Sequence, residues 1–511
     1  MSRSHKNRDL AAIDGKRFSM DGALTVLSVV LLLIVVVIPV ASIIYNSFFF
    51  QGHFDPQLFI GQLTDPGNLS AMWNTIKIAF WVTLLGTILG TFYAWLLGRS
   101  DIPAKGLMRA LFNIPYMFPP FLGAMAWDLL LNGRSGYLNK FLVSVFHLES
   151  APVNINSLGG IIFVEISYYF PFVFMQVVSA LERMDPTLEE CARIAGAKQM
   201  TVIRKITLPL VVPAISAGAL LIMTTSLAHF GVPSILGFSQ NIFTLPTKIY
   251  AVISRTGGSF EGIRQGAALS IMLVVVVGLA LILQKKLLSS GSYDIIKGKS
   301  MRPTLIKLRG AKAPLLVLCI ATLVLIVVVP LVMIFLVSLV RAYGLPLIPE
   351  NFTVNNYLKV FKADGTKGSI INSLMLSVGA GIICMFLGTL IAYVVQKIKP
   401  KGKEALEILS VLPYSLPGTV LAIGVILAWS GALFGISLYN TLWIILIAYI
   451  ARYLSFSMKS SSAALLQVHP SLEEAARTCG ASHMESLKDV TLPLIRPAMV
   501  SGFFLIFLPA M

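Results

Sequence analysis

The sequence predicts an all-α polytopic membrane protein made of two parallel six-helix repeats, the second of which stops within its fifth helix. The chain is 56% hydrophobic and only 12% charged, against roughly 25% charged residues in soluble domains. Several apolar runs exceed about 20 residues, the length of a helix that crosses about 30 Å of hydrocarbon. Between such runs a polar stretch occurs twice, at residues 186–210 and 470–494.

The two copies of this repeated stretch show that the chain is duplicated. They read PTLEECARIAGAKQMTVIRKITLPL and PSLEEAARTCGASHMESLKDVTLPL, and 13 of the 25 aligned residues are identical at a constant offset of 284. Shorter matches lie upstream: Gly90-Thr91 corresponds to Gly388-Thr389, and Ile114-Pro115-Tyr116 corresponds to Leu412-Pro413-Tyr414. The duplication therefore covers most of each half.

Four segments follow from the duplication. We predict an N-terminal cytoplasmic segment at 1–22, a first repeat of six spans at 23–284, a basic cytoplasmic linker at 285–313 and an incomplete second repeat of about five spans at 314–511. The linker holds eight Lys and Arg residues and no long apolar run. Because Met511 aligns with a residue in the middle of the fifth span, we expect the natural protein to continue for roughly 60 residues by repeat symmetry.

The spans are placed by hydropathy. We expect them at 23–44, 74–97, 107–131, 158–181, 210–230 and 266–284, then at 314–340, 370–395, 406–430 and 442–465, with an eleventh starting after the second polar stretch. The third span contains Pro115, Pro119 and Pro120, and the hydrogen bonds that these prolines break must be replaced by neighbouring groups. Gly86 and Gly90, continued by Ala94, predict a small-residue face for close helix packing.

The distribution of basic residues gives the topology. The region before the first span is basic and residues 45–73 contain no Lys or Arg, so the N-terminus is expected in the cytoplasm. Both polar stretches are then cytoplasmic, in a multi-pass protein of the bacterial plasma (inner) membrane. The net charge of +17 follows this pattern and does not form the basic, aromatic-rich surface of a nucleic-acid-binding protein. The expected surroundings are the lipid bilayer, with no nucleic acid.

The repeated stretch has the features of a short, capped helix. Thr187 with Glu190, and Ser471 with Glu474, have capping-box spacing. Small residues follow, and Gly196 in the first copy and its equivalent in the second allow a turn between two helical pieces. In the first copy, Thr207-Leu208-Pro209 restarts a helix, with Pro near its first turn.

The pattern EEAARxxGA followed by TLPL resembles the EAA motif of permease subunits of binding-protein-dependent ABC importers with the type I fold. The resemblance implies that each copy is a coupling helix that docks into a groove on a cytoplasmic ATPase. The one departure is Cys191, where the family commonly has Ala. Carried onto this sequence, the coupling residues are Glu189, Glu190, Ala192, Gly196, Ala197, Glu473, Glu474, Ala476, Gly480 and Ala481.

The resemblance also implies partners and a substrate. The partners would be two copies of an ABC ATPase, which bind ATP and Mg, and an extracytoplasmic substrate-binding protein. This chain would carry no cofactor and no catalytic residue. The fused double layout, with IPYMFPP and LPYSLPG, resembles ferric-iron permeases of the FbpB type. The same machinery importing 2-aminoethylphosphonate, thiamine or polyamine is the alternative.

An ion-coupled secondary transporter is the rival from another class. It would need acids inside the membrane, and these are sparse: Glu165, with Asp128 near a helix end. It also leaves the duplicated coupling helices unexplained. A catalytic ATPase is disfavoured because GKS at 298–300 has Tyr293 where a phosphate loop needs Gly. The histidines are scattered without metal-ligand spacing, so no metal site is predicted: His5, His53, His147, His229, His469 and His483.

Polar residues within spans are candidates for the substrate pathway, because burying them in lipid costs about 2.5–3.5 kcal/mol. They fall on matching helix faces at an offset of 284, and each set has i, i+3, i+4 spacing. Oxygen ligands suit Fe(III), and a guanidinium suits an anionic or chelated substrate. A structural Glu–Arg pair between the halves, with interfacial tyrosines, is the alternative. The candidates are Glu165, Tyr168, Tyr169, Tyr449, Arg452 and Tyr453.

Overall fold

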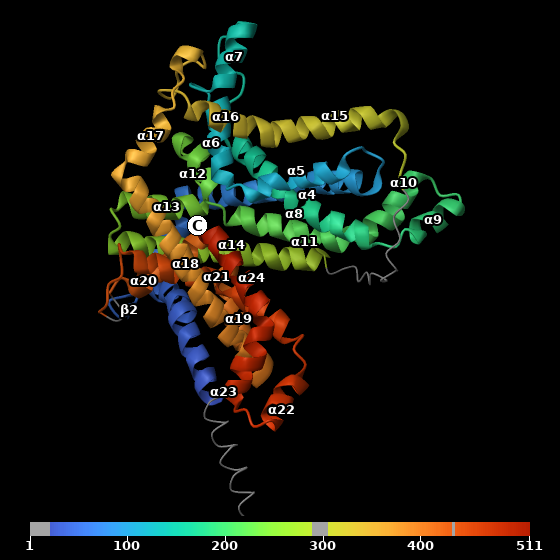
Figure 1. Cartoon of the computed structure of the whole chain (residues 1–511). Helices are drawn as coiled ribbons and strands as arrows, with labels where there is room; N and C mark the ends of the chain where they lie inside the picture. Colours follow the sequence, from blue (N-terminus) through green and yellow to red (C-terminus); the bar gives the residue numbers. More distant parts are fainter. Residues whose placement is uncertain (1–20, 289–304, 432–434) are drawn as a thin grey trace, which may run out of the picture. The chain divides into compact units, whose positions relative to one another are not determined.

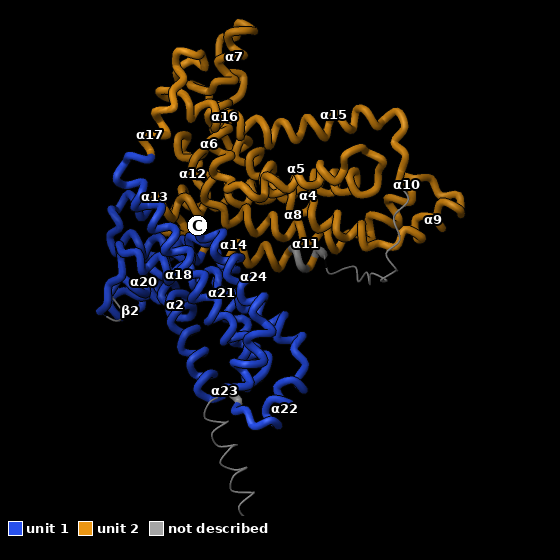
Figure 2. The backbone as a smooth tube through the Cα atoms, viewed as in Figure 1, with its two compact units in different colours: residues 1–60, 252–271, 361–511 blue, residues 61–251, 272–360 orange. Residues whose placement is uncertain are grey.

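The structure, a computed structural model, describes residues 21–288, 305–431 and 435–511 (Figure 1). These residues form two compact units (Figure 2). Unit 1 gathers residues 1–60, 252–271 and 361–511, and unit 2 gathers residues 61–251 and 272–360. Most of the predicted N-terminal segment and the middle of the linker, with its GKS tripeptide, lie outside the described residues.

Unit 2 is almost entirely helical. Its elements are α4 (Pro66–Arg99), α5 (Lys105–Met117), α6 (Pro120–Leu131), α7 (Tyr137–Phe146), α8 (Leu158–Arg183), α9 (Thr187–Ile194), α10 (Gln199–Val202), η2 (Ile203–Thr207), α11 (Leu208–Leu227), α12 (Gly231–Gly237), η3 (Phe238–Gln240), η4 (Arg309–Ala311), α15 (Lys312–Leu323), η5 (Val324–Val328), α16 (Val329–Ser338) and η6 (Pro349–Asn351).

Unit 1 repeats this plan. Its first helix, Asp21–Phe48, includes η1 (Leu33–Val37) and α2 (Ile38–Phe48). The other elements are β1 (Phe49–Phe50), β2 (His53–Phe54), α18 (Asp364–Tyr393), η7 (Val394–Ile398), α19 (Lys403–Ser415), α20 (Gly418–Trp429), α21 (Leu442–Leu465), α22 (Pro470–Thr478), α23 (His483–Ser486), η8 (Leu487–Thr491) and α24 (Leu492–Ala510). Four helices run from one unit into the other: α3 (Gln57–Thr64), α13 (Leu245–Arg255), α14 (Phe260–Leu288) and α17 (Asn355–Lys362).

The predicted spans are confirmed. Among the described residues, nine helices are long and apolar enough to cross a membrane, and two bent helix pairs bring the number to eleven. The tenth predicted span, 442–465, coincides with α21. The second is longer than expected, because Asp65 accepts a hydrogen bond from the N–H of Asn68 and starts α4 before the apolar run begins.

The predicted spans at 107–131 and 406–430 are bent sharply in the middle. Each is a pair of helices: α5 and α6 meet at 93°, and α19 and α20 meet at 110°. The breaks occur at Phe118 and Leu416, which are extended and precede prolines. A residue before proline is driven out of the helical region by contact with the proline ring. The two breaks correspond in the repeat, so the bend belongs to the shared plan.

Each unit is built around three packed helices, α4, α8 and α11 in unit 2 and α18, α21 and α24 in unit 1. Gly90, from the predicted small-residue face, lies where α4 packs against α8, and its counterpart Gly388 lies where α18 packs against α21. A Cβ added at Gly90 would lie 2.7 Å from the carbonyl oxygen of Phe170, and one added at Gly388 would lie 2.7 Å from the backbone nitrogen of Met458. Backbones approach this closely only where the side chain is missing.

The first helix of each repeat packs with helices from the other half of the sequence. In unit 1, α2 packs against α20, and a Cβ at Gly424 would lie 2.6 Å from the carbonyl oxygen of Pro39. In unit 2, α15 and α16 pack against α5 and α6. The first helix of each repeat therefore belongs to the compact unit that is formed mainly by the other repeat. The boundaries 23–284 and 314–511, drawn from sequence duplication, stay a prediction about the repeats.

Candidate functional site: the two coupling helices

The first repeated stretch begins differently from the capping box that the sequence predicts. Helix α9 starts at Thr187 with Pro186 before it, and the N–H of Glu190 donates to the carbonyl of Pro186. Thr187 is thus already inside the helix, and it donates both its N–H (2.9 Å) and its hydroxyl (2.8 Å) to Asp185 Oδ1. These donors lower the pKa of Asp185, the backbone N–H contributing most.

The second copy also starts without the predicted box. Helix α22 begins at Pro470, and the N–H of Ser471 donates to His469 Nδ1 at 3.3 Å. Both predicted capping boxes, Thr187 with Glu190 and Ser471 with Glu474, are therefore wrong. The physical reason is the proline before Thr187 and Ser471, whose fixed φ suits the start of a helix. The helix begins one residue before the predicted start in the first copy and two residues before it in the second, too early for the hydroxyl to cap it.

The ends of the two helices match each other closely. Gly196 and Gly480 have φ of +84° and +97°, a conformation that favours glycine. The N–H of Ala197 donates to the carbonyl of Ala192 at 3.0 Å, and Ala481 donates to Ala476 at 3.1 Å. This is the Schellman arrangement, in which glycine turns the chain and the last carbonyls of the helix are satisfied. The predicted glycine turn is confirmed in both copies.

Glu189 points into unit 2 and is only 3% exposed. Its Oε1 accepts a 2.6 Å hydrogen bond from the hydroxyl of Thr207. The same oxygen lies 3.8 Å from Nε of Arg99, at the end of α4. Glu189 therefore ties α9 both to the end of α4 and to η2.

Glu473 has the equivalent position in unit 1. Its Oε1 accepts a 2.8 Å hydrogen bond from the hydroxyl of Thr491 and lies 3.1 Å from Nζ of Lys397. Lys397 also donates to the carbonyl of Val468 at 3.3 Å. Neither Arg99 nor Lys397 belongs to the repeated stretch, so the motif did not indicate these two cations.

The other predicted coupling residues lie at or near the surface. Gly196, Gly480 and Glu474 are exposed, while the rest are half-buried: Glu190, Ala192, Ala197, Ala476 and Ala481. Beside them are apolar side chains that the sequence analysis did not select. Ile194 is 87% exposed and Met200 is 71% exposed. Leu188, Leu472 and Met484 are also exposed, so each unit presents an apolar surface at its coupling helix.

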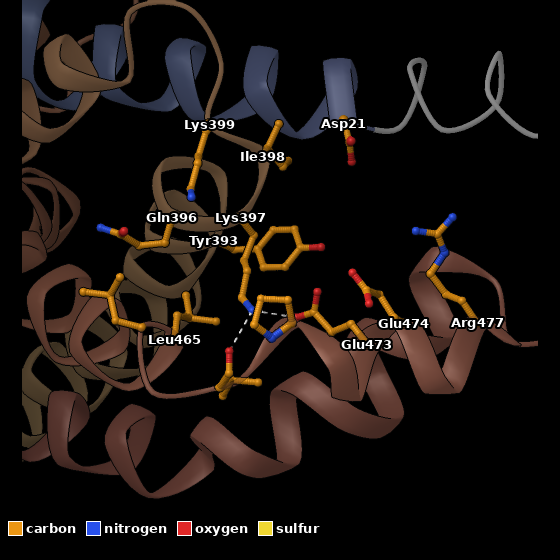
Figure 3. A pocket seen from close by; sticks show the side chains of 13 residues that line it. Asp21, Tyr393, Gln396, Lys397, Ile398, Lys399, Leu465, Glu473, Glu474 and Arg477 are labelled. Carbon is orange, nitrogen blue, oxygen red and sulfur yellow. Dashed lines mark hydrogen bonds and ion pairs between the residues drawn. The ribbon is translucent and has the colours of Figure 1, made fainter. Parts of the chain in front are cut away.

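A cavity of about 380 Å³ lies beside the second coupling helix in unit 1 (Figure 3). Its walls come from the end of η7, from α22 and from Asp21, the first residue of the first helix. Lys397 and Glu473 line it, as do Lys399 and Arg477. The ion pair of this unit is therefore reachable from water.

In unit 2 a short strap crosses the end of α4. The N–H of Ile306 donates to the carbonyl of Arg99 at 2.8 Å, and the N–H of Asp101 donates to the carbonyl of Ile306 at 3.1 Å. Asp101 in turn accepts from the N–H of Leu308 at 3.0 Å and from Nζ of Lys312 at 3.2 Å. These donors, the N–H of Leu308 first, lower the pKa of Asp101.

The first three pathway candidates lie on α8 in unit 2, and two of them, Glu165 and Tyr169, meet at the same histidine. Glu165 is completely buried on α8. Its carboxylate accepts a 2.5 Å hydrogen bond from Ser226 and lies 3.0 Å from Nδ1 of His229, while the ring of Tyr169 makes an edge contact with that imidazole. His229 was not selected from the sequence, because 64 residues separate it from Glu165. Tyr168 packs elsewhere, against Gly123, where a Cβ would lie 2.1 Å from its hydroxyl.

The other three candidates lie on α21 in unit 1. Arg452 donates from Nη1 to the carbonyl of Leu416 and, at 3.4 Å, to that of Pro413, and its guanidinium lies 5.3 Å from the centre of the Tyr414 ring. Arg452 thereby satisfies carbonyls freed where α19 meets α20, as a broken span requires. Tyr453 lies nearby and donates to the carbonyl of Pro509 at 3.3 Å, with the Tyr449 ring 6.1 Å away.

Metal ligands do not gather in the described part of the chain, where no group of three His, Cys, Asp or Glu side chains is placed to hold an ion. Glu165, His229 and Tyr169 form a smaller polar cluster. It combines carboxylate, imidazole and phenol groups.

Comparison with known proteins decides the family. Residues 83–290 and 384–511 match the model of the binding-protein-dependent transport system inner membrane component. The chain belongs to this family. The matched segments include α9 and α22 with all of α8, α11, α21 and α24, and the later parts of α4 and α18.

Two relatives match almost the whole chain, and a third matches part of it. The ferric transport system permease protein FbpB of Actinobacillus pleuropneumoniae is 28% identical over 98% of this chain and 72% of the relative. A Haemophilus influenzae protein assigned to a ferric transport system is 28% identical over 98% of this chain and 78% of its own. A Salmonella typhimurium protein assigned to 2-aminoethylphosphonate transport is 30% identical over 36% of this chain and 64% of its own.

Family membership and the helices together define the molecule. It is a multi-pass inner-membrane permease component with two permease repeats on one chain, as the sequence predicts. In each unit a short helix between two spans has a glutamate bound to its own bundle, a glycine turn and exposed apolar side chains.

Proposed function

We propose that this chain is the fused membrane subunit of an ATP-driven importer. Its coupling helices, within 187–206 and 471–490, dock on two copies of a cytoplasmic ABC ATPase. A substrate-binding protein delivers the substrate on the opposite face, and the N-terminus is cytoplasmic. The observation that carries the proposal is the identical construction of the two coupling helices, each anchored through one glutamate and ended by a left-handed glycine.

The docking surface has the composition of a protein interface. Ile194 and Met200 in one unit, and Leu472 and Met484 in the other, are large apolar side chains with high exposure. Buried apolar side chains surrounded by polar groups supply most of the energy of protein binding. Glu190 and Glu474 lie next to them and provide acidic contacts for basic residues of the ATPase.

The chemical work lies outside this chain. ATP and Mg are bound by the ATPase subunits, and ATP-driven closure brings these subunits against each other. That movement passes through the coupling helices into the two bundles. No cofactor is assigned to the chain itself.

Ferric iron is the proposed substrate, supported by the names of the relatives that match almost the whole chain. Glu165, Tyr169 and His229 add oxygen and nitrogen groups of the kind that bind Fe(III). Tyr168, Tyr449, Arg452 and Tyr453 are further pathway candidates by position. The Salmonella relative supports 2-aminoethylphosphonate as the alternative substrate.

Native cysteines offer a direct test of docking. Cys191 and Cys479 lie in the coupling helices and are exposed, whereas Cys319 and Cys384 are buried. A water-soluble maleimide should label the exposed pair in the purified subunit. Adding the ABC ATPase of the same transport system should protect both. Unchanged labelling in the presence of the ATPase would contradict docking at these helices.

Uptake measurements test the substrate. A strain lacking this transporter is complemented with the full-length gene and supplied with labelled Fe(III) or labelled 2-aminoethylphosphonate. The proposal expects restored uptake of Fe(III), and an ATPase-inactive strain serves as the control. Uptake of the phosphonate alone would replace the substrate while leaving the machinery in place.

A further inference from the structure

The same three-part contact joins the coupling helix to its bundle in both units. Its parts are a cation at the cytoplasmic end of the second span, a glutamate in the coupling helix and a threonine at the start of the fifth span. In unit 2 these are Arg99, Glu189 and Thr207. In unit 1 they are Lys397, Glu473 and Thr491. We call each set a latch.

The two latches correspond in sequence as well as in space. Glu189 and Thr207 match their partners at the offset of 284 that defines the repeated stretch. Arg99 matches Lys397 at 298, the offset that also relates Gly90 to Gly388. The cation therefore comes from a different part of the repeat than the acid. Two independent copies of the contact show that it belongs to the shared plan.

We propose that Arg99 and Lys397 are positioning residues for transport coupling. Through Glu189 and Glu473, they fasten each coupling helix to the second span of its unit. Movement of the ATPase then reaches α4 and α18 directly, as well as the helices joined to the coupling helix by the chain. The proposal rests on the proposed docking of the ATPase.

The geometry explains why a fastening is needed. Downstream, each coupling helix is joined to its bundle through a glycine turn, Gly196 or Gly480, with φ above +80°. A carboxylate that accepts from a threonine and faces a cation with the same oxygen links three elements at one point. Such a link resists rotation of the coupling helix about its turn.

The two latches differ in exposure. Arg99 is completely buried, and within the described part of the chain its three guanidinium nitrogens have no hydrogen-bond partner, so Glu189 is the counter-charge that it faces. Lys397 and Glu473 have 15% and 19% exposed side chains and line the 380 Å³ cavity. Charges that reach water are screened by salt, and buried charges are screened much less. The second latch is thus the one that salt weakens.

The test uses the second latch, because its partial exposure lets the variants fold. The wild-type subunit, Lys397→Met, Glu473→Gln and Lys397→Arg are reconstituted with the ATPase and binding protein. Uptake per ATP hydrolysed is measured together with ATPase affinity. We expect Lys397→Met and Glu473→Gln to lower uptake per ATP at least about fivefold, the lower end of typical coupling effects. Lys397→Arg should keep the wild-type ratio, because Arg fills this position in unit 2.

Two further variants separate positioning from general damage. The double variant Lys397→Glu, Glu473→Lys keeps an ion pair with the two charges exchanged. It should therefore recover much of the wild-type uptake per ATP, which a merely structural defect would not do. Lys399→Met removes a charge from the same cavity without removing the latch, so its ratio should stay at the wild-type value. Wild-type ratios in both single variants, or an exchange as poor as the single variants, would overturn the proposal. Failure of the wild-type subunit to bind the ATPase would instead overturn the proposed function, and the latch with it.

Discussion

Replacing the turn glycines of the coupling helices tests how tightly docking depends on their geometry. Gly196 and Gly480 have φ of +84° and +97°, and a Cβ added at either position meets nothing within 4 Å. The cost of Gly→Ala is therefore conformational only. An L-residue pays about 1–2 kcal/mol in the left-handed region, and the stiffer unfolded chain returns about 0.4–1 kcal/mol. The net destabilisation of each turn is about 1 kcal/mol.

The assay is the affinity of the purified subunit for its ATPase. At about 1.4 kcal/mol per tenfold change, one Gly→Ala substitution should weaken binding roughly fivefold. The two turns lie in different units, so the double variant should lose about 2 kcal/mol, or roughly thirtyfold, if their effects add. Thermal unfolding of the subunit should change little, because the turns lie outside the helical cores.

Two substitutions sharpen the result. Asn tolerates the left-handed region better than Ala, so Gly480→Asn should weaken binding less than Gly480→Ala. Gly106→Ala, in α5, also meets nothing within 4 Å and has no left-handed φ, and it should leave affinity unchanged. Wild-type affinity in Gly480→Ala, or equal losses for Ala and Asn, would refute the reasoning.

Three other predictions concern stability, transport and acid. Gly90→Ala should lower the unfolding temperature in detergent, because overpacking against the Phe170 backbone costs about 1–3 kcal/mol. Gly86→Ala should cost less, because its nearest contact is the terminal methyl of Ile222 at 3.1 Å and the backbone of Phe170 is 4.0 Å away; equal losses would contradict this. Glu165→Ala should cripple uptake without lowering the amount of protein assembled in the membrane, and wild-type uptake would remove Glu165 from the pathway. Because its pKa is lowered in the folded chain, Asp101 stabilises the strap above its ordinary pKa of 3.8 and loses this effect as pH falls through the folded value. The Leu308 amide should lose protection from hydrogen exchange as the pH falls through the folded pKa of Asp101. In Asp101→Ala the same loss should occur at neutral pH. Unchanged protection in either case would argue against a stabilising role for Asp101.

The spans, the duplication and the two short polar helices could be predicted from the sequence, because they depend on local hydropathy and on a motif repeated at one offset. The glycine turns could be predicted as well, since Gly196 and Gly480 interrupt otherwise helical segments. The capping boxes failed because Pro186 and Pro470 start their helices earlier than Thr187 and Ser471 suggest. Local spacing cannot decide between two helix starts that lie only one or two residues apart.

Other features depend on contacts between distant segments, and no local pattern encodes them. His229 reaches Glu165 because the end of α11 lies beside α8. Arg452 donates to carbonyls at a break 36 residues earlier in the chain. The latch cations lie outside the repeated stretch, and their match to each other emerges only when a second offset is applied.

The exchange of first helices has a consequence for how the protein is made. The helix Asp21–Phe48 emerges first from the ribosome, but its partner α20 begins about 370 residues later. At about 5–20 residues per second, synthesis leaves the helix without that partner for roughly 20 to 75 seconds. Its buried hydroxyls need no partner in the meantime, because Ser42 and Ser47 donate to carbonyls of their own helix at 2.8 and 2.7 Å. A gene cut at the linker would accordingly yield two fragments that each lack a helix made by the other, and the fragments would have to be produced in the same membrane to fold.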